Sequence, residues 1–144
     1  MKIAVFGSYK PERPDFPVRG TQNQFFEACS ALGRAIAGAK DTVIVGGSSE
    51  RTADFHVTHG VFGAAKGQKV VKPLVEVIRP SDGLQPYEQL VQDAPDLFSY
   101  HSRTEGWWAG AHLVSIREAD SVLTIGGGKS SYLGARPRKP VQAG

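Results

Sequence analysis

The chain has 144 residues, which is the length of one domain and is enough to bury a core. Its composition, 40% hydrophobic and 22% charged, is that of a globular protein, and a formal charge of +3 suits an anionic small ligand better than nucleic acid. The sequence has no apolar run of membrane-spanning length, and its start, MKIAVFGS, is expected to be a strand and not a signal peptide. We therefore expect one cytoplasmic domain, residues 1–144, whose partners include neither nucleic acid nor a membrane.

The first half of the chain alternates strand and helix patterns. Residues Lys2–Ser8 predict a strand, and the proline-containing segment 9–20 after them is expected to be a loop. Thr21 is a typical cap for the start of a first helix. A β-branched run over 41–45 then predicts a second strand, and a second helix is expected from about Thr52 to Lys66. Because the chain has a single cysteine, Cys29, no internal disulfide is expected. The residues expected on one face of the first helix are Phe25, Phe26, Cys29, Leu32 and Ile36.

The second half continues the alternation. Pro73 lies in the first half of the third strand region and weakens the strand prediction there, because proline has no N–H group to donate to a neighbouring strand. Alternating strands and helices imply right-handed crossovers and helices on both faces of the sheet. We predict a three-layer Rossmann-like α/β domain with a mainly parallel sheet of five or six strands. The elements expected here are a strand region over 69–80, a short helix over 87–92, a strand over 96–103, a helix over 107–119 and a strand over 121–127.

Three of the expected strands end in small residues at their carboxyl ends. In open parallel sheets, ligands bind outside these ends, at the point where the strand order reverses. Glycine also allows the backbone to approach a ligand closely. The sequence therefore predicts a nucleotide site at this edge, although the first turn lacks the third glycine of the dinucleotide fingerprint and no redox cofactor is expected. The residues concerned are Gly7, Ser8, Gly46, Gly47, Ser48, Gly126, Gly127 and Gly128.

The run Gly128-Lys129-Ser130 looks like the end of a Walker A loop. That motif needs another glycine five residues before its last one, and Leu123 stands there, inside an apolar run expected to be a buried strand. The sequence is therefore not that of a P-loop NTPase. Two alternatives remain open: Ser130 caps a helix whose free N–H groups attract phosphate, or the segment is a plain strand-to-helix turn.

The segments AVFGS, VIVGGSS, YHSR and ADSVLTIGGGKSSY together resemble the SLOG superfamily, over roughly Lys2 to Tyr132. That superfamily includes the cytokinin-activating phosphoribohydrolases, long called lysine decarboxylase-like proteins. It also includes nucleotide sensors found beside sirtuin and TIR domains in bacterial defence proteins. The resemblance implies a Rossmann-like domain that binds a nucleotide. In the sensors this ligand is an ADP-ribose-type nucleotide derived from NAD.

The resemblance also implies which branch the chain is closer to. The hydrolases end their fifth strand in Pro-Gly-Gly-x-Gly-Thr, followed by a glutamate pair, and carry an arginine after the fourth strand. Arg103 and Ser130 stand in positions similar to the arginine and the threonine, whereas Ile125 replaces the proline, and Tyr132 and Leu133 replace the glutamates. N-glycosidic hydrolysis needs a carboxylate. The resemblance thus implies a sensor-type domain that binds its nucleotide without turning it over.

Four further side chains are candidates for ligand contact. Arg103 is a fixed planar cation that suits phosphate, and Lys129 lies in the glycine-rich run; the alternative for both is a solvated surface position. Trp107 and Trp108 begin a helix beside the same edge. One of them is placed to stack on a purine, while packing is the expected role of each taken alone.

Two carboxylates are available to the alternative function, a nucleotide N-glycosidase. Glu105 is the acidic residue nearest to Arg103 in the sequence, and Asp54 begins the helix after the second glycine turn. Asp54 is explained equally well as a charge that complements the helix dipole. His56 and His59 are neighbours on one helix, but no third ligand stands at a convincing spacing, so no metal is expected.

The last expected helix and the end of the chain bear on assembly. The helix over 107–119 carries more apolar residues than one buried face uses, so a homodimer or higher oligomer is expected. From Ser130 to Pro140 there is room for one or two helical turns, while a full crossover to another strand takes a dozen residues or more. Either this last unit is degenerate, or the chain is a piece of a longer protein with a fused effector domain.

Overall fold

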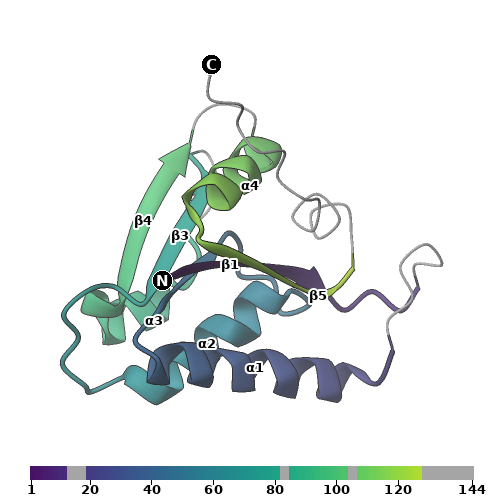
Figure 1. Cartoon of the computed structure of the whole chain (residues 1–144), viewed down its shortest axis with the longest axis horizontal. Coiled ribbons are helices and arrows are strands. Elements are labelled where there is room, and N and C mark those ends of the chain that lie inside the picture. The colour runs from purple at the N-terminus through teal and green to yellow at the C-terminus, as the bar shows by residue number, and fades with distance from the viewer. Residues whose placement is uncertain (13–18, 82–84, 104–106, 128–144) are drawn as a thin grey trace.

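The computed structural model describes residues 1–12, 19–81, 85–103 and 107–127, in which strands and helices alternate as predicted (Figure 1). The strands are β1 (Lys2–Ser8), β2 (Thr42–Val45), β3 (Val75–Pro80), β4 (Phe98–Arg103) and β5 (Ser121–Gly126). The helices are α1 (Gln22–Gly38), α2 (Ala53–Ala65), α3 (Glu88–Asp93) and α4 (Trp107–Glu118), with a short 3₁₀ turn η1 (Pro95–Leu97) before β4.

The five strands form one parallel sheet in the order β4-β3-β2-β1-β5. From β1 to β4 each strand is added on the same side, and the chain then crosses back to place β5 on the other side of β1. The predicted α/β class is therefore confirmed, with every strand pair parallel. The strand order reverses between β1 and β5, which is where parallel sheets of this kind bind ligands.

Helices cover both faces of the sheet in Figure 1, with α1 and α2 together on one face and α4 on the other. This division follows from the strand order. Right-handed crossovers that proceed in one direction place their helices on one face, and the reversed crossover to β5 places α4 on the opposite face. The larger core cluster lies between the sheet and the α1–α2 layer, and the smaller one is formed by Ala4, Phe6, Ile44, Ile78, Ala111 and Ala119.

The start of α1 follows the sequence prediction closely. The Thr21 hydroxyl accepts a hydrogen bond from the Gln24 N–H at 3.2 Å, and the Gln24 side chain accepts one from the Thr21 N–H at 2.9 Å. This reciprocal pair is a capping box, which satisfies two donors that the helix itself leaves free. Phe25, Cys29 and Ile36 are buried as expected.

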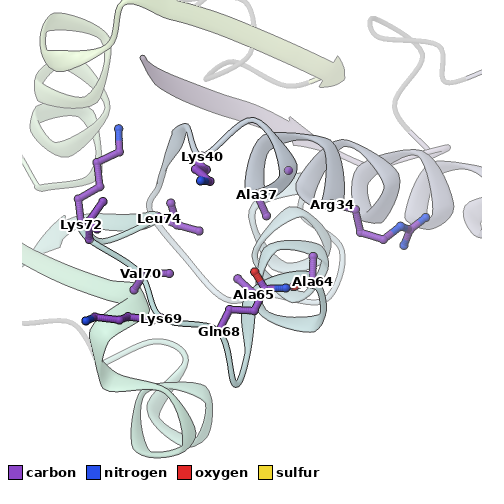
Figure 2. A pocket seen from close by; sticks show the side chains of 12 residues that line it. Arg34, Ala37, Lys40, Ala64, Ala65, Gln68, Lys69, Val70, Lys72 and Leu74 are labelled. Atoms are coloured by element: carbon purple, nitrogen blue, oxygen red, sulfur yellow. Dashed lines mark hydrogen bonds between the residues drawn. The ribbon is translucent and has the colours of Figure 1, made fainter.

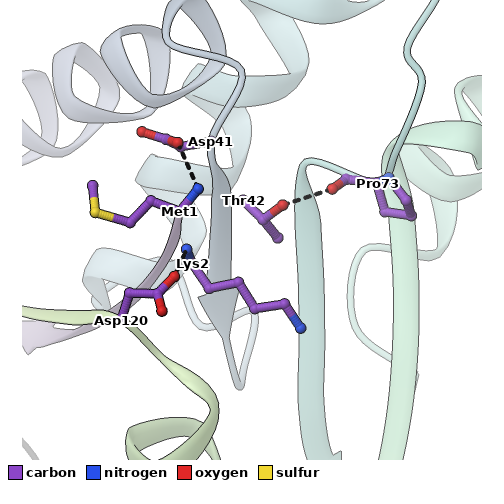
Figure 3. Close-up of polar contacts among 6 residues, drawn as sticks. All are labelled: Met1, Lys2, Asp41, Thr42, Pro73 and Asp120. Atoms are coloured by element: carbon purple, nitrogen blue, oxygen red, sulfur yellow. Dashed lines mark hydrogen bonds and ion pairs between the residues drawn. The ribbon is translucent and has the colours of Figure 1, made fainter.

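Polar contacts fix the amino-terminal edge of the sheet (Figure 3). The Asp120 carboxylate accepts from the Lys2 N–H at 2.7 Å, and the Thr42 hydroxyl donates to the Pro73 carbonyl at 2.9 Å. Asp41 forms an ion pair of 2.9 Å with the amino group of Met1. These contacts hold the segments that lead into β2 and β5 against β1, and the segment that leads into β3 against β2.

Two expectations about individual strands need correction. The third strand begins only at Val75, so the segment before and around Pro73 lies outside the sheet. The apolar run of the fifth strand predicts a buried strand, but β5 is an edge strand of the described sheet: Thr124 is exposed, and Val122 and Leu123 are only partly buried. An apolar run alone does not distinguish a central strand from an edge strand.

Among the described helices, none has both the length and the apolar character that a membrane span requires.

Candidate functional site

The carboxyl ends of β1 and β5 approach each other so closely that only glycine fits at two positions. A Cβ atom on Gly7 would lie 1.7 Å from the carbonyl oxygen of Ile125, and one on Gly126 would lie 2.5 Å from that of Ser8. Gly126 also has a φ of +69°, which favours glycine. The Ser8 hydroxyl donates to the Gly127 carbonyl at 3.4 Å. The first and third predicted turns therefore lie side by side at the point of strand reversal.

The second glycine turn, Gly46–Gly47, is tied to the first through the segment that follows each strand. Ser8 forms an isolated antiparallel bridge with Thr52, and the Tyr9 N–H donates to the Arg51 carbonyl at 2.9 Å. Ser48, which follows the turn, is exposed. The structure thus brings together the described members of all three predicted turns at one edge of the sheet.

Asp54 reaches back from the first turn of α2 to this second glycine turn. Its Oδ2 atom accepts from the N–H groups of Gly46 at 2.7 Å and Gly47 at 3.2 Å. Burial raises the pKa of the Asp54 carboxyl to about 6, and the two glycine N–H groups oppose that rise by stabilising the charged form. An acid of this pKa changes its charge near neutral pH, and its carboxylate occupies the donors that a phosphate would use.

Two aromatic side chains enclose the same turn. A Cβ atom on Gly46 would lie 3.2 Å from Cζ3 of Trp108, and one on Gly47 would lie 3.8 Å from Cη2 of that ring. The Trp108 side chain remains 37% exposed, so the ring touches the turn and still presents surface to solvent. The buried Tyr87 donates its hydroxyl to the Gly47 carbonyl. The second turn is therefore contacted by an acid, an indole and a phenol.

Neither tryptophan is buried in the core: Trp108 packs partly, on the second glycine turn, and the packing role expected of Trp107 stays a prediction. Trp107 is 63% exposed, and Trp108 lies against the ring of His112, with 6.0 Å between ring centroids. The sequence does not predict the involvement of Tyr87, because a single tyrosine before a short helix gives no signal. The contact of Trp108 with the glycine turn depends on the crossover to β5, which local patterns do not define.

Some predicted site residues are placed only in part. Arg103 ends β4, where its backbone pairs with Pro80, but its side chain lies outside the described residues. Because β4 is three strands from β1, Arg103 is roughly 14 Å away across the sheet. It shares the carboxyl edge with the glycine turns without lying beside Gly7. The predicted residues outside the described part of the chain are Glu105, Gly128, Lys129 and Ser130.

The two neighbouring histidines of α2 both lie against the ring of Phe55, and each makes contacts suited to packing. The ring of His56 stacks on Phe26 with 3.7 Å between centroids, and its Nε2 lies 2.7 Å from the Glu50 carbonyl oxygen. The ring of His59 lies against Phe55 at 4.1 Å. Within the described ranges, the His, Cys, Asp and Glu side chains form no group of three that is placed to hold a metal ion.

A charged cluster around one buried acid lies on the α4 face, near the amino-terminal half of β3. Glu76 is buried and accepts from the Lys2 ammonium at 2.8 Å, while its other oxygen lies 3.2 Å from Nε2 of His101. Burial favours the protonated form of Glu76, but the hydrogen bond from the Lys2 ammonium, together with its positive charge, outweighs this effect and holds the pKa of Glu76 below the usual range. This cluster gives His101 a partner that the sequence did not indicate, and it is separate from the glycine turns.

Comparison with known proteins supports the fold and no more. No family model matches the chain, and no curated protein matches it. It is similar to the X-ray structure of TM1055, a structural genomics target, with a TM-score of 0.58 and 22% identity over 93% of this chain and 67% of that one. The likeness shows a Rossmann-like α/β fold, and the resemblance to the SLOG superfamily stays a prediction.

Proposed function

We propose that this domain binds a nucleotide at the carboxyl edge of its sheet, and that the ligand is ADP-ribose-like or another NAD-derived nucleotide. The observation that carries the proposal is the pair of positions Gly7 and Gly126. At both, a side chain would collide with the neighbouring strand's backbone, and both lie at the reversal of strand order. Ligands of open parallel sheets bind just outside the carboxyl ends of the strands at this point, and the close approach of β1 and β5 brings two of the glycine turns together there.

The contacts of the second turn suggest how the ligand is arranged. Since Asp54 already accepts from the N–H groups of Gly46 and Gly47, phosphate is better accommodated at the exposed Gly126 and the adjoining Gly127. Trp108 presents part of its ring above the second turn and is suited to stack on the base. The Oδ1 atom of Asp54, which does not accept from the two glycine N–H groups, is suited to accept a hydrogen bond from a ribose hydroxyl.

The proposal predicts that Trp108→Ala weakens nucleotide binding about tenfold, because base–aromatic stacking contributes on the order of 1–3 kcal/mol. Calorimetric titration with ADP-ribose, its cyclic isomers, AMP and NAD measures this effect. Trp107→Ala is the matched control, since this neighbouring ring is 63% exposed and is not among the atoms nearest to Gly46 and Gly47, and it should leave the affinity unchanged. Absence of binding by every one of these nucleotides at millimolar concentration would reject the proposal.

A second candidate function is supported by Asp54 itself. A carboxyl group with a pKa of about 6 is suited to general acid–base catalysis at neutral pH, as a nucleotide N-glycosidase would require. Chromatography of the titrated samples distinguishes the two functions. A binding domain leaves the nucleotides intact, whereas an enzyme releases free base, and Asp54→Asn should then abolish the release.

We also propose that the domain forms a homodimer or higher oligomer through α4. Trp107 is 63% exposed, Trp108 37% and Leu113 59% on this short helix, and large apolar side chains gathered on the surface of one element usually mark a contact surface. Light scattering should show an oligomer at tens of micromolar, and Leu113→Glu should convert it to a monomer. A wild-type protein that is monomeric at this concentration contradicts the prediction.

A further inference from the structure

A hollow of about 240 Å³ lies at the opposite edge of the sheet from the glycine turns (Figure 2). It is formed where α1 and α2 end and where the chain then runs towards β3. Leu74, in its wall, directly precedes β3, whereas the glycine turns follow the carboxyl ends of their strands. The hollow is therefore separate from the proposed nucleotide site.

The lining of this hollow combines apolar side chains with cations. Leu74 and Ala65 are almost fully buried, and with Ala37, Ala64 and Val70 they give the hollow an apolar wall. Four exposed cationic residues also line it, and no acidic residue does. The cations are Arg34, Lys40, Lys69 and Lys72.

These four cations are not used elsewhere in the described structure. Cations near helix ends often bind the last free carbonyls, but here those carbonyls have other donors. The Ala37 carbonyl accepts from the Lys40 backbone N–H, and Gln68 donates to the carbonyls of Ala64 and Ala65. The nearby Asp41 pairs with the Met1 amino group. Across the residues that the structure describes, no ion pair involves any of the four cationic side chains.

We propose that the hollow is a second binding site, which takes a small anionic amphiphile: a compact apolar body of about one ring that carries a phosphate or carboxylate group. The wall of Leu74, Val70 and alanines selects the apolar body. The Arg34 and Lys69 side chains extend away from the hollow in Figure 2, so the cations form its rim, where these long exposed side chains turn towards the anionic group when it binds. The volume is below the 300–1,000 Å³ of typical ligand pockets, so a whole nucleotide does not fit.

Titration of the ¹⁵N-labelled protein with phenyl phosphate, followed by NMR, tests the site. Saturable shifts are expected at the amides of Ala64, Gln68 and Leu74, with an affinity at least fivefold above that of inorganic phosphate and of benzyl alcohol. Benzoate in a parallel titration distinguishes a carboxylate ligand from a phosphate ligand. Equal affinity for inorganic phosphate, or shifts confined to the glycine turns, would overturn the proposal.

Surface variants assign the binding to the cations without disturbing the core. The double variant Lys69→Gln/Lys72→Gln should weaken phenyl phosphate binding at least fivefold. Lys66→Gln is the matched control: this exposed lysine lies near the same segment, with its ammonium 5.7 Å from the centre of the Phe62 ring, and does not line the hollow. Equal binding by the double variant and by the control would reject the site.

Discussion

Replacement of Gly33 by alanine is expected to lower the free energy of unfolding by about 3 kcal/mol, the upper part of the range for overpacked cores. A Cβ atom at this position would lie 2.1 Å from the Val57 carbonyl oxygen and 2.9 Å from the Val61 nitrogen. Both are backbone atoms of α2, so no rotamer change relieves the clash, and α1 and α2 must move apart. Gly60 has the reciprocal contact, 2.3 Å from the Ser30 carbonyl oxygen.

Gly63 supplies a matched control for this prediction, because it lies on α2 and a Cβ atom added there would meet no described atom within 4 Å. Gly63→Ala should raise the stability by about 0.5–1 kcal/mol through the higher helix propensity of alanine. Urea denaturation followed by circular dichroism measures both variants. If Gly33→Ala unfolds at the wild-type midpoint, the close α1–α2 contact is wrong.

The same contact shows what periodicity can predict about this fold and what it cannot. The spacing of Phe25, Cys29 and Ile36 predicts the buried face of α1, because buried side chains repeat with the helix. Gly33 lies on that face as well, but a pattern of apolar side chains treats glycine as a gap. The close approach of two helices depends on small residues meeting in space, and that requires the relative position of the helices.

The candidate site is predictable to a similar degree. Strand ends rich in glycine predict which edge carries the turns, because all carboxyl ends of a parallel sheet meet at one edge. The partners of those turns are not predictable in the same way. The sequence identifies Asp54 as a charge at a helix start, but its bonds to Gly46 and Gly47 depend on the path of the intervening loop. Trp108 and Tyr87 reach the turn from distant parts of the chain.

The Asp54 carboxyl yields the second large effect, a stability difference that depends on pH. Its pKa is about 6 in the folded protein and 3.8 for the free side chain. Between these values the folded state binds a proton that the unfolded state does not, so the stability contributed by this group is present below about pH 4 and is lost as the pH rises through 6. A difference of about two pKa units corresponds to about 3 kcal/mol.

Asp54→Asn should therefore be about as stable as the wild type near pH 4 and more stable by about 3 kcal/mol near pH 7. Asparagine keeps a carbonyl oxygen that can accept from Gly46 and Gly47, and it carries no charge to desolvate. Comparing the two proteins at each pH cancels the titration of other groups such as Glu76, whose lowered pKa gives the opposite slope. Asp54→Ala leaves both glycine N–H groups without this acceptor and should lose about 1–3 kcal/mol even at pH 4. Urea denaturation between pH 4 and pH 7 measures the free energy of unfolding of all three proteins. If the difference in this free energy between the wild type and Asp54→Asn stays constant with pH, the fold does not desolvate the Asp54 carboxyl.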